Sequence, residues 1–172
     1  PLKRIDGTET SLAAFKGKVL LVVNVASQCG LTPQYEGLEK LYKNYQARGL
    51  VVMGFPANEF GAQEPGTNTE IQDFCRSKFG IDFPMFSKIV VKGEGQHPLY
   101  QHLTETLPEA RFPANSPMRA RLEKHGMKQQ KSNDILWNFE KFLVDGQGDV
   151  VARFSPDTTP DDPALTQAIE AE

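Results

Sequence analysis

The fold of this chain is constrained most by two nearly continuous apolar runs, VLLVVNVA (residues 19–26) and LVVMGFP (residues 50–56). Runs of this kind, rich in β-branched residues, are typical of strands that are covered on both faces. Between them, apolar side chains recur at helical spacing up to Gly49, namely Tyr35, Leu38, Leu41, Tyr42 and Tyr45. A strand, a helix and a strand in this order predict two parallel strands joined by a right-handed crossover.

A loop, a helix and a short strand are predicted after the second run. Residues 55–68, FPANEFGAQEPGTN, are rich in turn-forming residues and have no period. Thr67 and Glu70 have the spacing of a capping box, and Gly80 marks the end of the helix that they open. The apolar segment KIVVKG (residues 88–93) predicts a further strand.

The C-terminal half predicts two helices and a hairpin. Leucines at 99, 103 and 107 indicate a helix, and the proline-rich, basic residues 108–133 indicate an exposed insertion. The segment ILWNFEKFLVDGQGDVVARF predicts a β-hairpin with its turn at residues 145–148. Thr159 and Pro160 are the expected cap of a final helix that buries Leu165 and Ile169.

Together these elements predict an α/β fold. An Asp6–Gly7 turn signal opens the chain and indicates an N-terminal hairpin. The order of the remaining elements favours a central mixed β-sheet flanked by helices, with the last hairpin as its antiparallel edge. The 172 residues carry no internal repeat and no linker, so we expect a single domain over residues 1–172.

The composition argues against several partners and settings. The net charge of −3 disfavours nucleic acid and anionic membrane surfaces, because both select a basic stripe. No uninterrupted apolar stretch approaches the ~20 residues of a membrane span. Two cysteines are too few for a secreted disulfide framework. We therefore expect a reducing, cytoplasmic setting, with the periplasm left open.

Cys29 lies between the first apolar run and the predicted helix, in NVASQCGLTPQY (residues 24–35). Thr32 and Pro33 have the residue types of an N-cap and a first helical position. Backbone N–H groups before a helix favour negative charge, and the thiolate is the form of cysteine that attacks. Two interpretations remain open: a reactive thiol, which the polar context favours, and a small buried structural cysteine.

Other chemistries have little support in the sequence. Zinc-type CxxC and HxxxH spacings are absent, and neither strand leads into a GxGxxG motif or a P-loop. His97, His102 and His125 lie far from Cys29 along the chain, and we interpret them as surface or capping residues. A cysteine–histidine pair that meets only in space stays possible at this point.

Three neutral side chains are candidates to share a site with Cys29. Gln63 lies in the loop after the second strand, and Trp137 and Asn138 lie at the head of the C-terminal hairpin. Loops at the carboxyl ends of parallel strands gather at one edge of a sheet, where Cys29 is also expected. Taken alone, each has a plain structural interpretation, as a core aromatic or as a hydrogen bonder within a loop.

Four segments, in this order, resemble the glutathione peroxidase family in its cysteine form: NVASQCGLTPQYEGLEKLY, GFPANEFGAQEPGTNTEIQDFC, DFPMFSKI and WNFEKFLVDGQGDVVARFSP. The resemblance covers nearly the whole chain and implies a thioredoxin-like fold. It implies that Cys29 is the peroxidatic residue and that Gln63, Trp137 and Asn138 complete the catalytic set. Uncharged donors can stabilise both a thiolate and the leaving oxygen of a peroxide. The implied reaction is attack of the thiolate on the O–O bond, which leaves a sulfenic acid.

The resemblance also implies a role for Cys75, which otherwise fits as a small apolar residue on a helix face. Two-cysteine members of the family carry their resolving cysteine at this place. The implication is an internal disulfide between Cys29 and Cys75, reduced by thioredoxin or by glutathione. A disulfide needs Cα atoms about 5.5–6 Å apart, and a cysteine on a helix is not expected to start that close to Cys29. We therefore expect the helix of residues 67–80 to unwind on oxidation.

The predicted function is therefore a thiol peroxidase that acts on hydrogen peroxide and organic hydroperoxides without a cofactor or metal, as a monomer or weak oligomer. Two alternatives are a peroxide-responsive redox sensor and a thioredoxin-fold binding protein with an inert cysteine. The chain departs from the family at Ala57, where many members have a third cysteine, and at Glu59, where glutamine is common. Without the third thiol, Cys29 and Cys75 can form only one internal disulfide.

Overall fold

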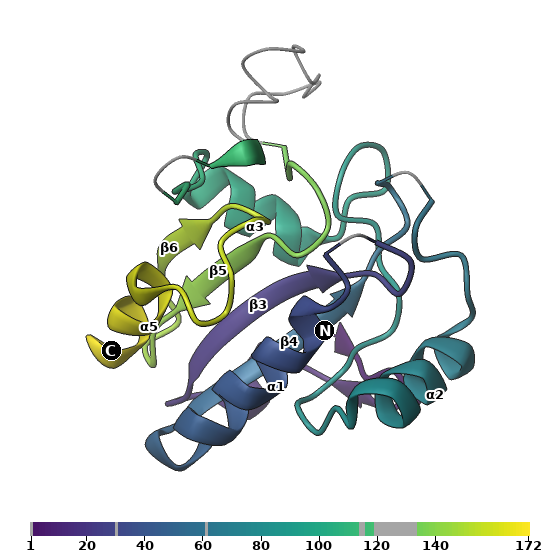
Figure 1. Ribbon diagram of the computed structural model, residues 1–172, viewed down its shortest axis with the longest axis horizontal. Helices are drawn as coiled ribbons and strands as arrows, with labels where there is room; N and C mark the ends of the chain where they lie inside the picture. Colours follow the sequence, from purple (N-terminus) through teal and green to yellow (C-terminus); the bar gives the residue numbers. More distant parts are fainter. Residues whose placement is uncertain (1, 30, 61, 114–115, 119–133) are drawn as a thin grey trace.

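The computed structural model describes residues 2–29, 31–60, 62–113, 116–118 and 134–172. The two apolar runs form β3 (Val19–Val25) and β4 (Leu50–Pro56), which pair in parallel as predicted. The predicted C-terminal hairpin consists of β5 (Lys141–Val144) and β6 (Val150–Phe154). Because β5 pairs antiparallel with β3, the result is a mixed sheet in the order β4-β3-β5-β6 (Figure 1).

The helices and the remaining short elements were largely predicted. A separate N-terminal hairpin is formed by β1 (Leu2–Lys3) and β2 (Glu9–Thr10). The helical segments are η1 (Leu12–Phe15), α1 (Gln34–Tyr45), η2 (Gln46–Arg48), α2 (Asn68–Phe79), α3 (Pro98–Thr106) and α5 (Pro163–Glu170). None of the helices in the described ranges is long and apolar enough to cross a membrane.

Both faces of β3 are covered, which explains its continuous apolar sequence. Leu21 and Val23 belong to a buried cluster that includes side chains of α1, α2 and α5. Leu20 and Val22 belong to a second cluster, which includes Leu99, Tyr100 and Leu103 of α3. The sheet therefore lies between helices on its two faces, as Figure 1 shows.

Helix α2 begins and ends as the sequence predicts. The Thr67 hydroxyl accepts a hydrogen bond from the Glu70 N–H at 3.2 Å, and the Glu70 carboxylate accepts one from the Thr67 N–H at 3.1 Å. Gly80 ends the helix in the left-handed region, with φ of 59°. Of its twelve residues, only Ile71 and Cys75 are buried, while Phe74 and Phe79 pack half-buried against the same core cluster.

The predicted strand at residues 88–93 is wrong. Within this segment, the Ile89 N–H donates to the carbonyl oxygen of Pro56, the last residue of β4, at 3.0 Å. The Lys88 and Val91 N–H groups bind side chains instead of a strand backbone. The Lys88 N–H donates to the Asn68 side chain at 2.9 Å. The Val91 N–H donates to the Glu59 carboxylate at 2.6 Å. An apolar run predicts burial, but it does not show whether a neighbouring strand is available for pairing.

The cap of the C-terminal helix lies later than Thr159. The Asp162 carboxylate accepts the Ala164 N–H at 2.8 Å and caps α5, because a carboxylate satisfies a free N–H of the first turn. Leu165 and Ile169 are buried, as predicted.

The predicted insertion at residues 108–133 falls largely outside the described residues, which omit 114–115 and 119–133. In its described part, the Arg111 N–H donates to the Arg153 carbonyl oxygen at 2.8 Å. The start of the segment therefore continues along the end of β6.

Gly54 marks a close approach between β4 and the segment that follows α2. A Cβ atom at this position would lie 2.6 Å from the Met85 sulfur and 3.2 Å from the Phe83 ring, and both side chains are buried. We expect Gly54→Ala to lower the free energy of unfolding by about 1–3 kcal/mol through overpacking. The control is Gly66→Ala, whose Cβ would make only ordinary contacts. Equal urea midpoints for the two variants would contradict this prediction.

Candidate active site

Thr32 holds the loop that carries Cys29. Its Oγ1 accepts a hydrogen bond from the Cys29 N–H at 2.9 Å and donates one to the Ala26 carbonyl oxygen at 2.8 Å. The predicted role of Thr32 as the cap of α1 is therefore wrong, because the N-cap position is Pro33. The threonine hydroxyl instead closes the turn between the end of β3 and the cysteine.

The Cys29 sulfur is nearly buried and meets a backbone donor. The side chain is 8% exposed, and the Leu31 N–H donates to Sγ at 3.3 Å. A donor aimed at the sulfur stabilises negative charge on it. The loop before α1 thus supplies the free N–H that the sequence predicts, while little of the sulfur is open to solvent.

Gln63 and Asn138 join the loop of Cys29 through direct hydrogen bonds. The Gln28 N–H donates to the Gln63 carbonyl oxygen at 3.0 Å. The Asn138 side-chain amide donates to Gln63 Oε1 at 2.9 Å. Three segments that are far apart in sequence therefore meet at one edge of the sheet: the loop after β3, the loop after β4 and the residues before β5.

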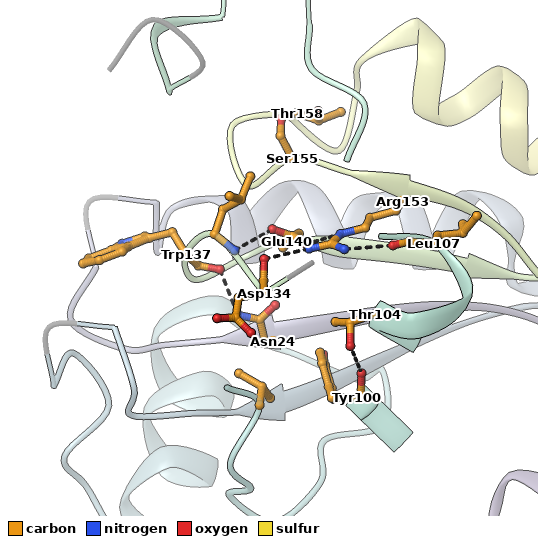
Figure 2. Close-up of polar contacts among 12 residues, drawn as sticks. Asn24, Tyr100, Thr104, Leu107, Asp134, Trp137, Glu140, Arg153, Ser155 and Thr158 are labelled. Atoms are coloured by element: carbon orange, nitrogen blue, oxygen red, sulfur yellow. Dashed lines mark hydrogen bonds and ion pairs between the residues drawn. The ribbon is translucent and has the colours of Figure 1, made fainter. Parts of the chain in front are cut away.

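Asn24 fixes the backbone on both sides of Asn138. Its side-chain amide donates to the Trp137 carbonyl oxygen at 3.0 Å (Figure 2), and its own carbonyl oxygen accepts the Phe139 N–H at 2.6 Å. The indole of Trp137 is half-buried and packs on Phe60, with ring centroids 5.5 Å apart. Asn24 was not predicted to take part in the site, although a lone amide inside a buried apolar run was a usable signal.

A buried ion pair holds the residues that precede Trp137. Glu140 Oε2 lies 2.6 Å from Arg153 Nε, and both side chains are almost fully buried (Figure 2). The carboxylate also accepts the Leu136 N–H at 2.9 Å. The guanidinium donates to the carbonyl oxygens of Leu107 at 2.8 Å and Asp134 at 3.0 Å. This pair was not predicted, since the charged residues of a hairpin usually face water.

Cys75 is a free, buried cysteine in the same core cluster as Cys29. Its side chain is 1% exposed. Burial raises the pKa of its thiol to about 11, with a smaller opposing effect from the Tyr35 hydroxyl. While α2 is packed, Cys75 is therefore protonated near neutral pH and is a poor nucleophile.

The histidines take no part in this arrangement of described residues. His97 caps α3, because its Nδ1 accepts the Leu99 N–H at 3.1 Å. His102 is exposed, and His125 lies outside the described residues. Within the described ranges, no group of three or more His, Cys, Asp or Glu residues is placed to hold a metal ion.

Comparisons with known proteins agree with the fold and with the resemblance of the motifs. Residues 2–104 match the family model described as glutathione peroxidase. The chain is 53% identical, over 98% of its length and 92% of the relative's, to the thioredoxin/glutathione peroxidase BtuE of Escherichia coli strain K12. It is 46% identical, over 92% of its length and 85% of the relative's, to the hydroperoxy fatty acid reductase gpx1 of Synechocystis.

A solved structure extends the similarity of fold. A thiol:disulfide interchange protein of the thioredoxin family from Chlorobium tepidum superimposes with a TM-score of 0.60. The superposition covers 97% of this chain and 90% of the other, at 18% identity. The predicted thioredoxin-like fold is therefore confirmed.

Proposed function

Because the chain belongs to the glutathione peroxidase family, we propose that it reduces hydrogen peroxide and organic hydroperoxides with Cys29 as the nucleophile. The Cys29 thiolate attacks the outer oxygen of the peroxide and the O–O bond breaks. The sulfur gains the hydroxyl group as a sulfenic acid, and the released oxygen takes a proton and leaves as water or an alcohol. Organic hydroperoxides are included because the Synechocystis relative is named as a hydroperoxy fatty acid reductase.

One observation supports this proposal most: the Asn138 amide donates to Gln63 Oε1, and the Gln63 backbone is bound to the loop of Cys29. With its oxygen occupied, the Gln63 amide keeps its N–H groups free to donate. We assign Gln63, Asn138 and the Trp137 indole N–H to holding the peroxide and to stabilising charge on the leaving oxygen. The Leu31 N–H, which donates to Sγ, supports the thiolate.

In the second half of the proposed cycle, Cys75 resolves the sulfenic acid. The Cys75 sulfur bonds to the Cys29 sulfur, hydroxide leaves, and the thiol proton converts it to water. Cys75 has to leave its buried position first, because burial keeps its thiol protonated. Helix α2 suits such a step, since only two of its side chains, Ile71 and Cys75, are fully buried, whereas α1 buries four.

Opening of α2 on oxidation can be measured directly. We expect the backbone amides of α2 to lose protection from hydrogen exchange when the reduced protein is converted to the disulfide form, whereas α1, with four buried side chains, keeps its protection. The Cys75→Ser variant is the matched control and should show no loss of protection after peroxide treatment. Equal protection of α2 in the reduced and disulfide forms would contradict an opening of this helix.

Thioredoxin is the proposed reductant of the disulfide, because the Escherichia coli relative is named as a thioredoxin/glutathione peroxidase and the chain has a second cysteine. The test is steady-state peroxide consumption with thioredoxin and glutathione systems side by side. We expect sustained thioredoxin-driven turnover that is lost in Cys75→Ser after about one equivalent of peroxide. Undiminished turnover of that variant would contradict the resolving role. Arrest of the wild type after one equivalent would indicate a redox sensor.

A further inference from the structure

Lys141 is a buried cation at the start of β5. Its side chain is fully buried, and its Nζ donates to the carbonyl oxygens of Phe139 at 2.7 Å and Pro156 at 3.0 Å. Among the described residues, no carboxylate lies within ion-pair distance of Nζ, and the neighbouring Glu140 binds Arg153 instead. Burying an ammonium group costs free energy of folding. The position of Lys141 is therefore explained better by a role in the site than by a gain in stability.

The first contact of Lys141 holds a strained residue. Phe139 has φ of 67°, a left-handed conformation that is unfavourable for a bulky side chain and persists only where its surroundings enforce it. Its N–H donates to the Asn24 carbonyl oxygen, and its carbonyl oxygen accepts from Lys141. Both backbone polar groups of the residue after Asn138 are thus held by buried partners.

The second contact connects this strained turn to the helix that follows Cys29. The Pro156 carbonyl oxygen accepts from Lys141 Nζ and also from the side-chain amide of Gln34, the first residue of α1. The amino group of Lys141 therefore connects the Asn138 segment to the Pro156 carbonyl oxygen, which also binds the first residue of α1.

We propose that Lys141 is a positioning residue of the peroxidase site: through Phe139 it holds the Asn138 amide on Gln63. The proposal rests on the function assigned above to Asn138. In this role, Lys141 contacts neither the peroxide nor the Cys29 sulfur. It acts by fixing the backbone turn that decides where the Asn138 side chain lies, and displacement of a catalytic group by about 1 Å is worth about 100-fold in rate.

A double-mutant cycle tests whether Lys141 acts through Asn138. We expect Lys141→Met to lower kcat/KM for hydroperoxide about 10- to 100-fold. Because both changes should remove one and the same contribution, Lys141→Met combined with Asn138→Ala should be no slower than Asn138→Ala alone. Effects that multiply would overturn the proposal, as would a Lys141→Met rate within about twofold of wild type. Lys43→Met, which removes an exposed lysine, is the matched control.

The fluorescence of Trp137, the only tryptophan of the chain, provides a second measurement alongside the double-mutant cycle. Its fluorescence should shift in folded Lys141→Met and stay unchanged in Lys43→Met. If Lys141→Met does not fold, the cycle is repeated with Lys141→Gln, which keeps a shorter donor. Wild-type protein without any peroxide turnover would instead refute the function on which the proposal rests.

The burial of Lys141 also predicts a pH dependence of stability. Burial lowers the pKa of Lys141 to about 7, against opposing effects of Glu140 and Asp157. Between pH 7 and 9 the unfolded chain keeps this proton while the folded protein loses it, so stability rises with pH in this window. We expect the urea midpoint of wild type to rise from pH 7 to 9 and that of Lys141→Met to show less of this rise. An equal rise in both proteins would show that the Lys141 side chain is solvated in the folded protein. This result would overturn the proposed role of its hydrogen bonds to Phe139 and Pro156.

Discussion

Cys29→Ser is expected to reduce the rate of hydroperoxide reduction on the order of a thousand-fold or more, because the proposed nucleophile is removed. A serine hydroxyl stays protonated at neutral pH and has no counterpart of the sulfenic acid on the path to a disulfide. Serine is close to cysteine in size and can still accept the Leu31 N–H, so the loop should keep its shape. Steady-state peroxide consumption with the thioredoxin system measures the effect.

The control for Cys29→Ser is the variant that lacks the other thiol. Cys75→Ser should still consume about one equivalent of peroxide in its first turnover, whereas Cys29→Ser should consume none. Thermal unfolding of both variants shows whether they are folded. Peroxide consumption by folded Cys29→Ser at the wild-type rate would show that the reactive group lies elsewhere.

Glu140→Gln is expected to lower the free energy of unfolding by about 3–5 kcal/mol, the largest change of stability that we predict. The amide keeps the shape of the side chain but removes the negative charge that lies 2.6 Å from the buried guanidinium of Arg153. For a chain of this size, such a loss corresponds to a fall in Tm on the order of 10 °C. Since the pair also holds the segment before Trp137, peroxidase activity should fall with it.

Two further variants make the prediction for the buried pair specific. Adding Arg153→Met to Glu140→Gln removes the buried guanidinium as well and should recover part of the lost stability. Asp82→Asn makes the same chemical change in an exposed pair with Lys43 and should cost less than about 1 kcal/mol. Equal losses for Glu140→Gln and Asp82→Asn would contradict a special role of the buried pair.

Much of the fold could be predicted because its determinants are local. The apolar run of β3 indicates cover on both faces, and the capping box at Thr67 with Gly80 bounds α2. Cys29 and Gln63 lie at one edge of the sheet because β3 and β4 are parallel. Asn138 lies at the same edge because it precedes β5, which runs antiparallel to β3. These residues were recognisable as one set only through the resemblance to the family, because each alone has an ordinary structural interpretation.

The supporting residues could not be predicted, because their roles depend on contacts that arise only in the folded chain. Lys141 and Glu140 are consecutive charged residues in a hairpin, where exposure is the usual outcome. Their burial follows from distant partners, such as the Pro156 carbonyl oxygen for Lys141 and Arg153 for Glu140. Likewise, Thr32 has the residue type of a helix cap, but the turn of the loop brings its hydroxyl to Cys29.

The chemistry proposed for the two sulfurs is tested most directly by peptide mass spectrometry after a single turnover. Reduced protein is mixed with about one equivalent of hydroperoxide and quenched with a reagent that traps sulfenic acids. The account predicts a peptide pair joined between Cys29 and Cys75 in the wild type, and a trapped sulfenic acid on Cys29 in Cys75→Ser. Unmodified Cys29 after the peroxide has been consumed, or oxidation that begins at Cys75, would contradict it.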